Sequence, residues 1–436
     1  MRRLVLLVAI VLLLPAEASA GTLFLIDGRG WGHGVGLSQY GARGYAGAGW
    51  GYQRILAHYY PGTELRVVPA RPVRVLLAEK RPEVEIASSK PFRVVDASGK
   101  VRKLKPGTQR LVAGKLAKLR FPLRYQPGAS PLTLDGDAYR GELVVYRDAP
   151  TLMVVNKLPI DRYLRGVVPW EMPDDWHPEA LRTQSVVARS YALATLKPGT
   201  RFDLYADTRS QVYSGVGAES ASTNRAIGST AGQVVVWNGR VATTFYHSTS
   251  GGKTASVAEV WPDATPVPYL VSVPDPYDSL SKLHRWGPVL LTPAQMGSKL
   301  GLGPVLDLVA ARGPSGRVVE LKLKLRSGER TMLSQDFRRA LDLRSTWFAV
   351  RVLQLEAASG RGLASADRAT VLHGFVRGLG EVRLEQQVNG GSWKTIKRVR
   401  RAPDGRFTVS VSLRRTTSYR LATAVGAGAA VTVRSR

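Results

Sequence analysis

The sequence predicts a mixed α+β protein, with a helix-containing core, a β-rich inserted region and a small all-β, sandwich-like C-terminal domain. Short strand-like runs separated by Gly, Pro and Asn, Asp or Ser fill residues 71–155. A long helical pattern covers 178–196, and apolar and polar residues alternate after residue 365. We therefore expect five parts. They are a leader at residues 1–20, a Gly- and aromatic-rich unit that packs on the core at 21–65, a β-rich region at 66–155, the core at 156–355 and a C-terminal domain at 365–436.

The first twenty residues have the pattern of a secretory signal peptide. Arg2 and Arg3 precede an unbroken apolar run at 4–14, and Ala-Ser-Ala at 18–20 supplies the small residues of a cleavage site. The run is too short to span a bilayer comfortably, so an uncleaved anchor is the less favoured alternative. We expect a secreted mature chain that begins at Gly21 and has no transmembrane segment.

The composition indicates which classes of partner an exported chain of this kind can attract. The 436 residues carry a formal charge of +29 and no cysteine, which excludes a disulfide framework. A strongly cationic protein attracts polyanions. We see no nucleic-acid-binding motif, so after export the available polyanions are anionic wall polymers, acidic lipids and peptidoglycan.

Glycine recurs at every second position from 28 to 36 in the N-terminal unit, which suits a backbone that needs unusual dihedral angles or close approach by another group. The G-x-G-x-x-G spacing of a dinucleotide loop is missing. Residues 52–59 predict a short helix, closed by a Pro61-Gly62 turn. Residues 356–364 predict a linker before the C-terminal domain.

The helix predicted at 178–196 has Pro178 in its first turn and Glu179 at its positive end, and Pro198-Gly199 ends it. Arg189 lies within an otherwise apolar stretch of this helix. A cation at that position suits an anionic or hydroxyl-rich ligand, and a structural ion pair explains it equally well.

Glu171 is the strongest candidate for chemistry. It lies between Trp170 and Met172, and Pro169 and Pro173 bracket that trio, which predicts a rigid loop just before the long helix. Apolar neighbours on both sides would desolvate the carboxylate and raise its pKa, as a general acid at neutral pH requires. An ordinary exposed loop glutamate is the alternative interpretation of the same pattern.

Two downstream stretches, 207–215 and 245–254, place hydroxyl and aromatic side chains together, as in sugar-binding surfaces. A Ser-His-acid hydrolase is the alternative, but the G-x-S-x-G elbow is absent. There is no HExxH motif and no cysteine, and the chain has six histidines. We therefore expect neither a metal site nor a cofactor.

These blocks together resemble the SpoIID/LytB family of bacterial envelope proteins. The resemblance rests on four ordered segments of the chain, at residues 167–193, 207–215, 223–254 and 260–278. The stretch RGWGHGVGLSQYGA at 29–42 is also a family mark. It is expected downstream of the other blocks in many members, so this chain is similar to a permuted arrangement of the same parts.

The resemblance implies a lytic transglycosylase that cuts peptidoglycan strands stripped of stem peptides, with Glu171 as the catalytic acid. It further implies that Arg189, Tyr269 and Asp278 line the cleft, and that the sugar contacts are Ser210, Gln211, Tyr246, His247, Ser248 and Thr249. Val271 departs from the family pattern, where a basic residue is expected after PYL, and that puts one substrate contact in doubt.

Two other functions remain open. The LytB side of the family is associated with enhancement of a cell-wall amidase, so the chain could bind glycan and a partner amidase without cutting. A plain extracellular carbohydrate-binding protein is the third interpretation. In each case the expected location is the cell envelope.

Overall fold

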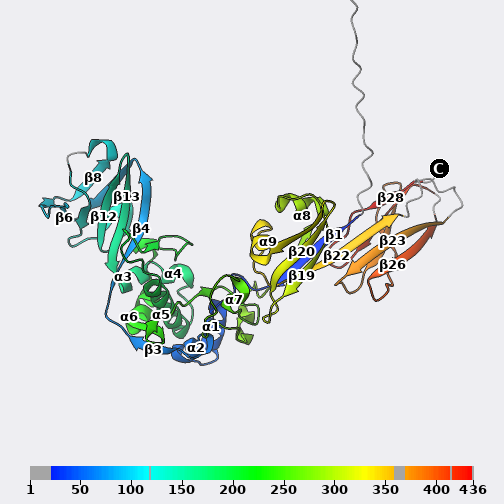
Figure 1. Cartoon of the computed structure of the whole chain (residues 1–436), viewed down its shortest axis with the longest axis horizontal. Helices are drawn as coiled ribbons and strands as arrows, with labels where there is room; N and C mark the ends of the chain where they lie inside the picture. The colour runs from blue at the N-terminus through cyan, green and yellow to red at the C-terminus, as the bar shows by residue number, and fades with distance from the viewer. Residues whose placement is uncertain (1–20, 117–118, 358–368, 413–414, 435–436) are drawn as a thin grey trace, which may run out of the picture.

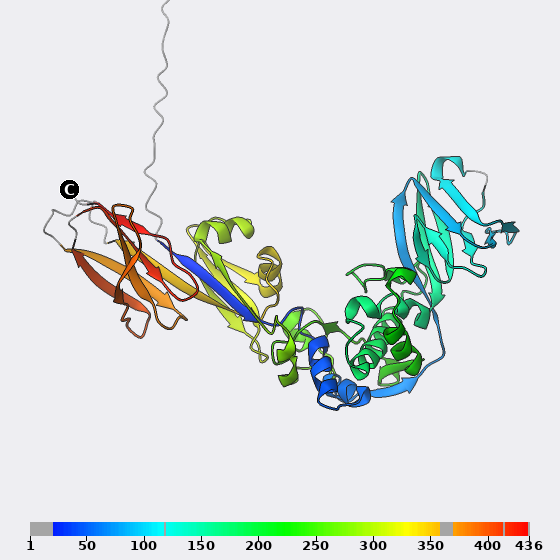
Figure 2. The same cartoon turned by 180° about the vertical axis from the view of Figure 1, so that it is seen from behind.

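The computed structural model describes residues 21–116, 119–357, 369–412 and 415–434. The expected signal peptide at 1–20 and residues 358–364 of the expected linker lie outside the described residues, and residues 356 and 357 are the end of a strand rather than a linker. The mixed α+β class is confirmed, with several antiparallel sheets. Figures 1 and 2 show an elongated molecule with sheets at both ends and helices between them.

One end of the molecule is built from two sheets around one apolar core. The larger has the strand order β14-β4-β13-β12-β9-β6-β7, and the smaller the order β11-β10-β5-β8. Their strands are β4 (Pro72–Arg81), β5 (Glu83–Ser88), β6 (Phe92–Val95), β7 (Val101–Leu104), β8 (Gly107–Val112), β9 (Leu123–Gln126), β10 (Leu132–Leu134), β11 (Asp137–Tyr139), β12 (Glu142–Asp148), β13 (Thr151–Pro159) and β14 (Leu204–Tyr205).

The middle of the molecule is a helical layer that includes the predicted helices. The predicted helix at 52–59 is confirmed, and the long helix begins at Pro178 as predicted and ends at Ala194. The helices are α1 (Gln39–Gly47), α2 (Tyr52–Tyr59), α3 (Ile160–Arg165), α4 (Val168–Glu171), α5 (Pro178–Ala194), α6 (Ala221–Ser229) and α7 (Val257–Val260). Short strands accompany them: β2 (Leu37–Ser38), β3 (Glu64–Val67), β15 (Gln233–Trp237), β16 (Arg240–Val241) and β17 (Tyr246–His247).

The other end combines the first strand of the chain with the last ones. β1 (Leu23–Arg29) lies between β18 (Arg285–Leu291) and β22 (Phe348–Ala357), in a sheet that continues to β23 (Ala369–Arg377) and β26 (Arg406–Ser412). The N-terminal unit is thus divided, because β1 joins this sheet while the residues after it pack on the helical layer.

Two further sheets complete this end. Leu384, Tyr419 and Leu421 of one of them share an apolar core with the sheet that contains β1. The remaining elements are β19 (Val305–Arg312), β20 (Val318–Leu325), β21 (Gly328–Leu333), β24 (Arg383–Val388), β25 (Lys394–Arg398), β27 (Thr417–Ala422), β28 (Val431–Val433), α8 (Pro293–Lys299) and α9 (Ser334–Ala340). Within the described residues, no helix is both long and apolar enough to cross a membrane.

Candidate functional site

Glu171 is the last residue of the short helix α4, not part of a loop. Pro169 is tolerated because it occupies the first turn, where its missing N–H would have no helical partner. Met172, the residue after the helix, has an extended backbone, as expected for the residue before Pro173. The two prolines therefore limit α4 to one helical turn and fix the position of Glu171 relative to α5.

The Glu171 side chain is partly buried and carries a raised pKa. Burial raises the pKa of its carboxyl above the ordinary value, while hydrogen bonds from Tyr246 and Gln39 oppose that rise. The direction agrees with the sequence prediction, but its source differs. Met172 is buried, whereas Trp170 is 60% exposed, so the two sequence neighbours do not enclose the carboxyl.

A chain of hydrogen bonds between uncharged side chains leads to Glu171. Tyr163 Oη donates to Gln211 Oε1 at 3.3 Å, and Gln211 Nε2 donates to Tyr246 Oη at 3.0 Å. Tyr246 is hydrogen bonded to Glu171, and Gln39 Nε2 donates to Glu171 Oε2 at 3.3 Å. Two of the predicted sugar contacts, Gln211 and Tyr246, are thus joined to the predicted acid.

The glycine-rich segment 30–36 runs directly along the stretch that contains Tyr246. Trp31 and Thr249 exchange backbone hydrogen bonds of 2.8 and 3.1 Å. Strand β2 pairs in parallel with β17, with Leu37 opposite Tyr246. Gly36 has a φ of +70°, and a Cβ there would lie 2.1 Å from the Phe245 carbonyl oxygen. Glycine is required at this point because the two backbones touch.

Arg189 is fully buried and does not line an open surface. Its Nε donates to Asp161 Oδ1 at 2.7 Å, and its terminal nitrogens donate to the carbonyl oxygens of Gln233 and Ile227 at 3.0 and 3.3 Å. The structural ion pair, which the sequence left as an alternative, is what the structure shows.

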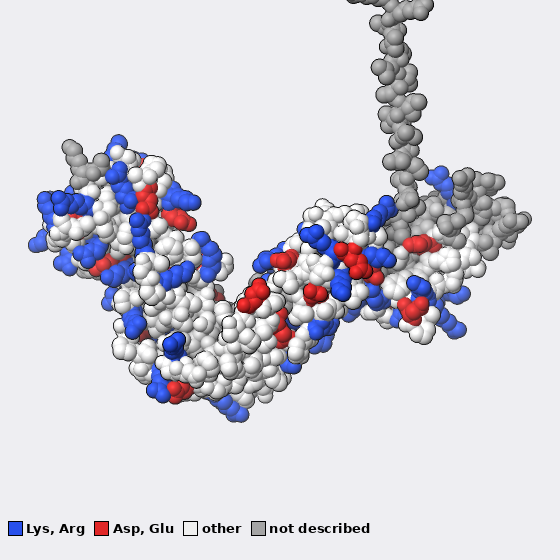
Figure 3. All heavy atoms as spheres, viewed as in Figure 1, with Lys and Arg blue, Asp and Glu red and all other residues white. Residues whose placement is uncertain are grey.

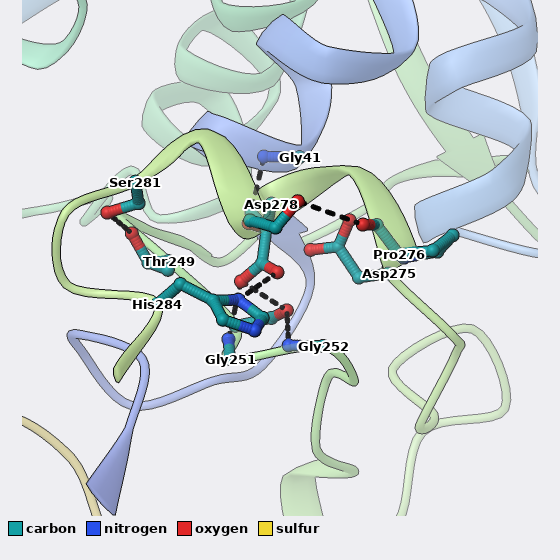
Figure 4. A network of polar contacts seen from close by, with 12 residues as sticks. Gly41, Thr249, Gly251, Gly252, Asp275, Pro276, Asp278, Ser281 and His284 are labelled. Atoms are coloured by element: carbon teal, nitrogen blue, oxygen red, sulfur yellow. Dashed lines mark hydrogen bonds and ion pairs between the residues drawn. The ribbon is translucent and has the colours of Figure 1, made fainter. Parts of the chain in front are cut away.

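Asp278 is also enclosed. Its carboxylate, which is fully buried, accepts hydrogen bonds from Ser250 Oγ at 3.1 Å and from the Gly251 N–H at 2.5 Å. His284 Nδ1 lies 2.8 Å from its other oxygen. Figure 4 shows His284 and Gly251 next to the Asp278 carboxylate, with Asp275 beside it. Asp278 therefore holds the glycine turn that follows residue 250.

The remaining predicted sugar contacts are engaged within the protein. Ser210 Oγ accepts the Tyr205 N–H at 3.1 Å, and Thr249 Oγ1 donates to Ser281 Oγ at 2.9 Å. Ser248 Oγ lies 3.4 Å from Thr249 Oγ1. His247 is buried, with Nδ1 3.2 Å from the Val35 carbonyl oxygen, and burial lowers its pKa well below the ordinary value.

Tyr269 is buried in a different part of the helical layer. Its hydroxyl accepts the Thr243 N–H at 3.0 Å. It borders a pocket of about 460 Å³, whose lining residues do not include Glu171 and are Trp237, Asn238, Arg240, Val241, Ala242, Thr243 and Tyr269. The structure does not bring Tyr269 into the hydrogen-bonded group around Glu171.

Sequence reasoning missed Gln39 and Tyr163 as neighbours of the site. Gln39 was visible only as part of the stretch 29–42, and 132 residues separate it from Glu171. Tyr163 lies in α3, the helix before α4, and its ring packs on Tyr213 with centroids 5.1 Å apart. Neither residue has a local pattern that indicates contact with a carboxyl group.

Charge is unevenly distributed over the face drawn in Figure 3. Lys and Arg side chains predominate over the end that contains β4 to β13, they are mixed with Asp and Glu towards the other end, and the middle of this face is largely uncharged. A cationic surface of this kind attracts anionic polymers over a long range.

Comparison with known proteins gives a consistent set of relatives. Residues 148–237 match the family described as Stage II sporulation protein (SpoIID). The chain is 42% identical over 116 residues to the amidase enhancer of Bacillus subtilis, which covers 26% of this chain and 15% of that protein. It is 28% identical over 225 residues to stage II sporulation protein D of the same organism, covering 47% and 63%.

An uncharacterized protein of Brachyspira hyodysenteriae is 39% identical over 144 residues, covering 32% of this chain and 39% of that protein. The chain thus spans between 15 and 63% of the length of these three relatives.

Proposed function

The chain carries a domain of the SpoIID family at residues 148–237, and from this premise we propose that it is an exported lytic transglycosylase of peptidoglycan. Its substrate is the glycan strand of alternating N-acetylmuramic acid and N-acetylglucosamine, preferably free of stem peptides. Its products are strands with 1,6-anhydro ends. Glu171 is the acid and base of the reaction.

The observation that supports this proposal most is the state of Glu171. Its carboxyl is partly exposed, burial raises its pKa, and its hydrogen-bond donors, Gln39 and Tyr246, are neutral. A carboxyl in such surroundings holds a proton closer to neutral pH than an ordinary glutamate does, which general acid catalysis requires. Partial exposure leaves it accessible to a substrate.

The reaction needs only one carboxyl group. In the first half, Glu171 gives its proton to the glycosidic oxygen as the bond from muramic C1 to that oxygen breaks. In the second half, the Glu171 carboxylate takes the proton of the muramic C6 hydroxyl, whose oxygen bonds to C1 and closes the anhydro ring. The C6 hydroxyl is already held near C1, so no second carboxylate is needed to activate a water molecule.

The test is digestion of purified, peptide-free glycan strands, followed by mass spectrometry of the ends. We expect anhydro ends from the wild-type chain, and a loss of at least about 100-fold for Glu171→Gln. Asp175→Asn is the matched control, because Asp175 is an exposed carboxylate four residues away. Absence of anhydro ends from the wild-type protein contradicts the proposal.

The similarity to an amidase enhancer supports a second candidate, in which the chain binds glycan and stimulates a wall amidase without cutting. The Lys- and Arg-rich end that contains β4 to β13 would then hold an anionic wall polymer. In that case Glu171→Gln stimulates an added amidase as well as the wild-type chain does, and neither protein produces anhydro ends.

A further inference from the structure

The groups that contact Glu171 come from two segments that are far from it in sequence and paired with each other. Gln39 follows β2, Tyr246 lies in β17, and these two strands form the parallel pair of the helical layer. On this geometry we propose that Gln39 and Tyr246 are positioning residues, which hold the Glu171 carboxyl in one orientation for catalysis. The inference rests on the proposed function, and it makes the N-terminal segment 30–42 a component of the catalytic site.

Gln39 is fixed by its neighbours on both sides. Ser38 pairs with His247 in the strand and caps α1, where its Oγ accepts the Gly41 N–H at 3.1 Å. The Tyr40 N–H donates to the Ser248 carbonyl oxygen at 3.0 Å. Gln39 itself is 7% exposed. Because the backbone is tied down before and after it, the amide group reaches Glu171 from a defined direction.

Tyr246 is oriented by a chain of donors. A phenol has one hydrogen to donate. Because the Tyr246 oxygen accepts from Gln211 Nε2, its own hydrogen is free to point at the Glu171 carboxyl. Gln211, which is 1% exposed, is oriented in turn because its Oε1 accepts from Tyr163. All hydrogen bonds of the chain therefore run in one direction, toward Glu171.

Two donors on one carboxyl group have a chemical consequence. Both hydrogen bonds favour the ionised form, and so they limit the rise in pKa that burial causes. They also prevent the carboxyl from rotating away between the two halves of the reaction, when it must first give and then take a proton. Gln39 and Tyr246 thus determine both the orientation of the Glu171 carboxyl and the balance between its protonated and ionised forms.

The decisive measurement is the Glu171 pKa itself, followed by ¹³C NMR of the full chain labelled at glutamate Cδ, with Glu171→Gln to assign the resonance. Gln39→Leu and Tyr246→Phe each remove one donor, so each should raise this pKa. The alkaline limb of the pH–rate profile should move upward with it, and kcat should fall about tenfold. Gln53→Leu, at an exposed position of α2, and Tyr269→Phe are the matched controls and should leave the Glu171 pKa unchanged.

The outcomes separate this inference from the proposed function. An unmoved Glu171 pKa in variants that melt like the wild-type chain overturns the positioning role, whatever the activity. Wild-type protein that produces no anhydro ends overturns the proposed function instead. If Tyr246→Phe does not fold, the Gln39→Leu titration still decides the question, because an amide-to-isobutyl change on the first turn of α1 leaves β2 intact.

Discussion

The carboxyls of Glu171 and Asp278 both lie in the part of the molecule where the N-terminal segment meets residues 245–254. Asp278 is fully buried, and a hydroxyl, a backbone N–H and an imidazole occupy its oxygens. Glu171 is partly exposed and contacts two neutral side chains. An enclosed carboxylate with its lone pairs occupied stabilises a turn, whereas a partly open one with a raised pKa can exchange a proton. The two carboxyl groups, which the family resemblance places in one cleft, thus differ in exposure, and only that of Glu171 has the access that the proposed chemistry requires.

Arg189 gives the largest expected effect on the structural side of this comparison. Arg189→Met removes one donor each from the carbonyl oxygens of Gln233 and Ile227, and it takes the ion-pair partner from Asp161. We expect the free energy of unfolding to fall by roughly 3–5 kcal/mol in urea titrations. Arg182→Met, on the exposed side of the same helix, should cost less than about 1 kcal/mol. An Arg189→Met variant that is as stable as the wild-type chain but binds glycan less well would contradict this structural role and support a role in substrate binding.

Asp275, next to Asp278, is expected to act against stability at neutral pH. Burial, together with the charge of Asp278, raises the pKa of Asp275 from 3.8 to about 6. The folded state therefore favours the protonated acid. The stability that comes from protonated Asp275 is fully present below pH 3.8 and is lost as the pH rises through 6. The free energy of unfolding falls by about 3 kcal/mol as a result.

The substitution Asp275→Asn tests this expectation, because the amide oxygen can still accept the Tyr59 hydroxyl, which donates to Oδ1 at 2.8 Å. We expect the variant to be more stable than the wild-type chain at pH 7.5 by up to about 3 kcal/mol. The difference should vanish at pH 4. A variant that is less stable at both pH values would show that the ionised carboxylate holds this region together.

Tyr269→Phe is expected to have the smallest effect. It removes one hydrogen bond, from the Thr243 N–H, and should lower the free energy of unfolding by about 1 kcal/mol. The rate of anhydro-end formation should stay unchanged, because Tyr269 lines a pocket that does not include Glu171. Lost activity at unchanged stability would place Tyr269 in the substrate cleft after all.

Local patterns predicted the long helix, but for Glu171 they left an ordinary loop glutamate as the alternative. The resemblance to the SpoIID/LytB family is what pointed to Glu171 as the acid, and the residue lies at the end of α4 rather than in a loop. Pro178 in the first turn and Pro198-Gly199 beyond the end are short-range signals, and the long helix lies where they predict it. The raised pKa of Glu171 was also predicted, although Trp170, one of its two supposed neighbours, points to solvent.

Contacts between distant segments were beyond such reasoning. Gln39 meets Glu171, and β1 meets β22, only because the chain folds back over more than a hundred residues, and no periodicity encodes which partner is found. The spacing of glycines did indicate a close backbone approach. It could not name Phe245 as the residue approached.

The most direct test of the central claim, that one carboxyl group cuts glycan without help from water, is digestion of peptide-free strands in H₂¹⁸O. The wild-type chain should yield new ends that are 1,6-anhydro and free of ¹⁸O, because the C6 hydroxyl supplies the attacking oxygen. New reducing ends that carry ¹⁸O would show a water-dependent hydrolase and contradict the account.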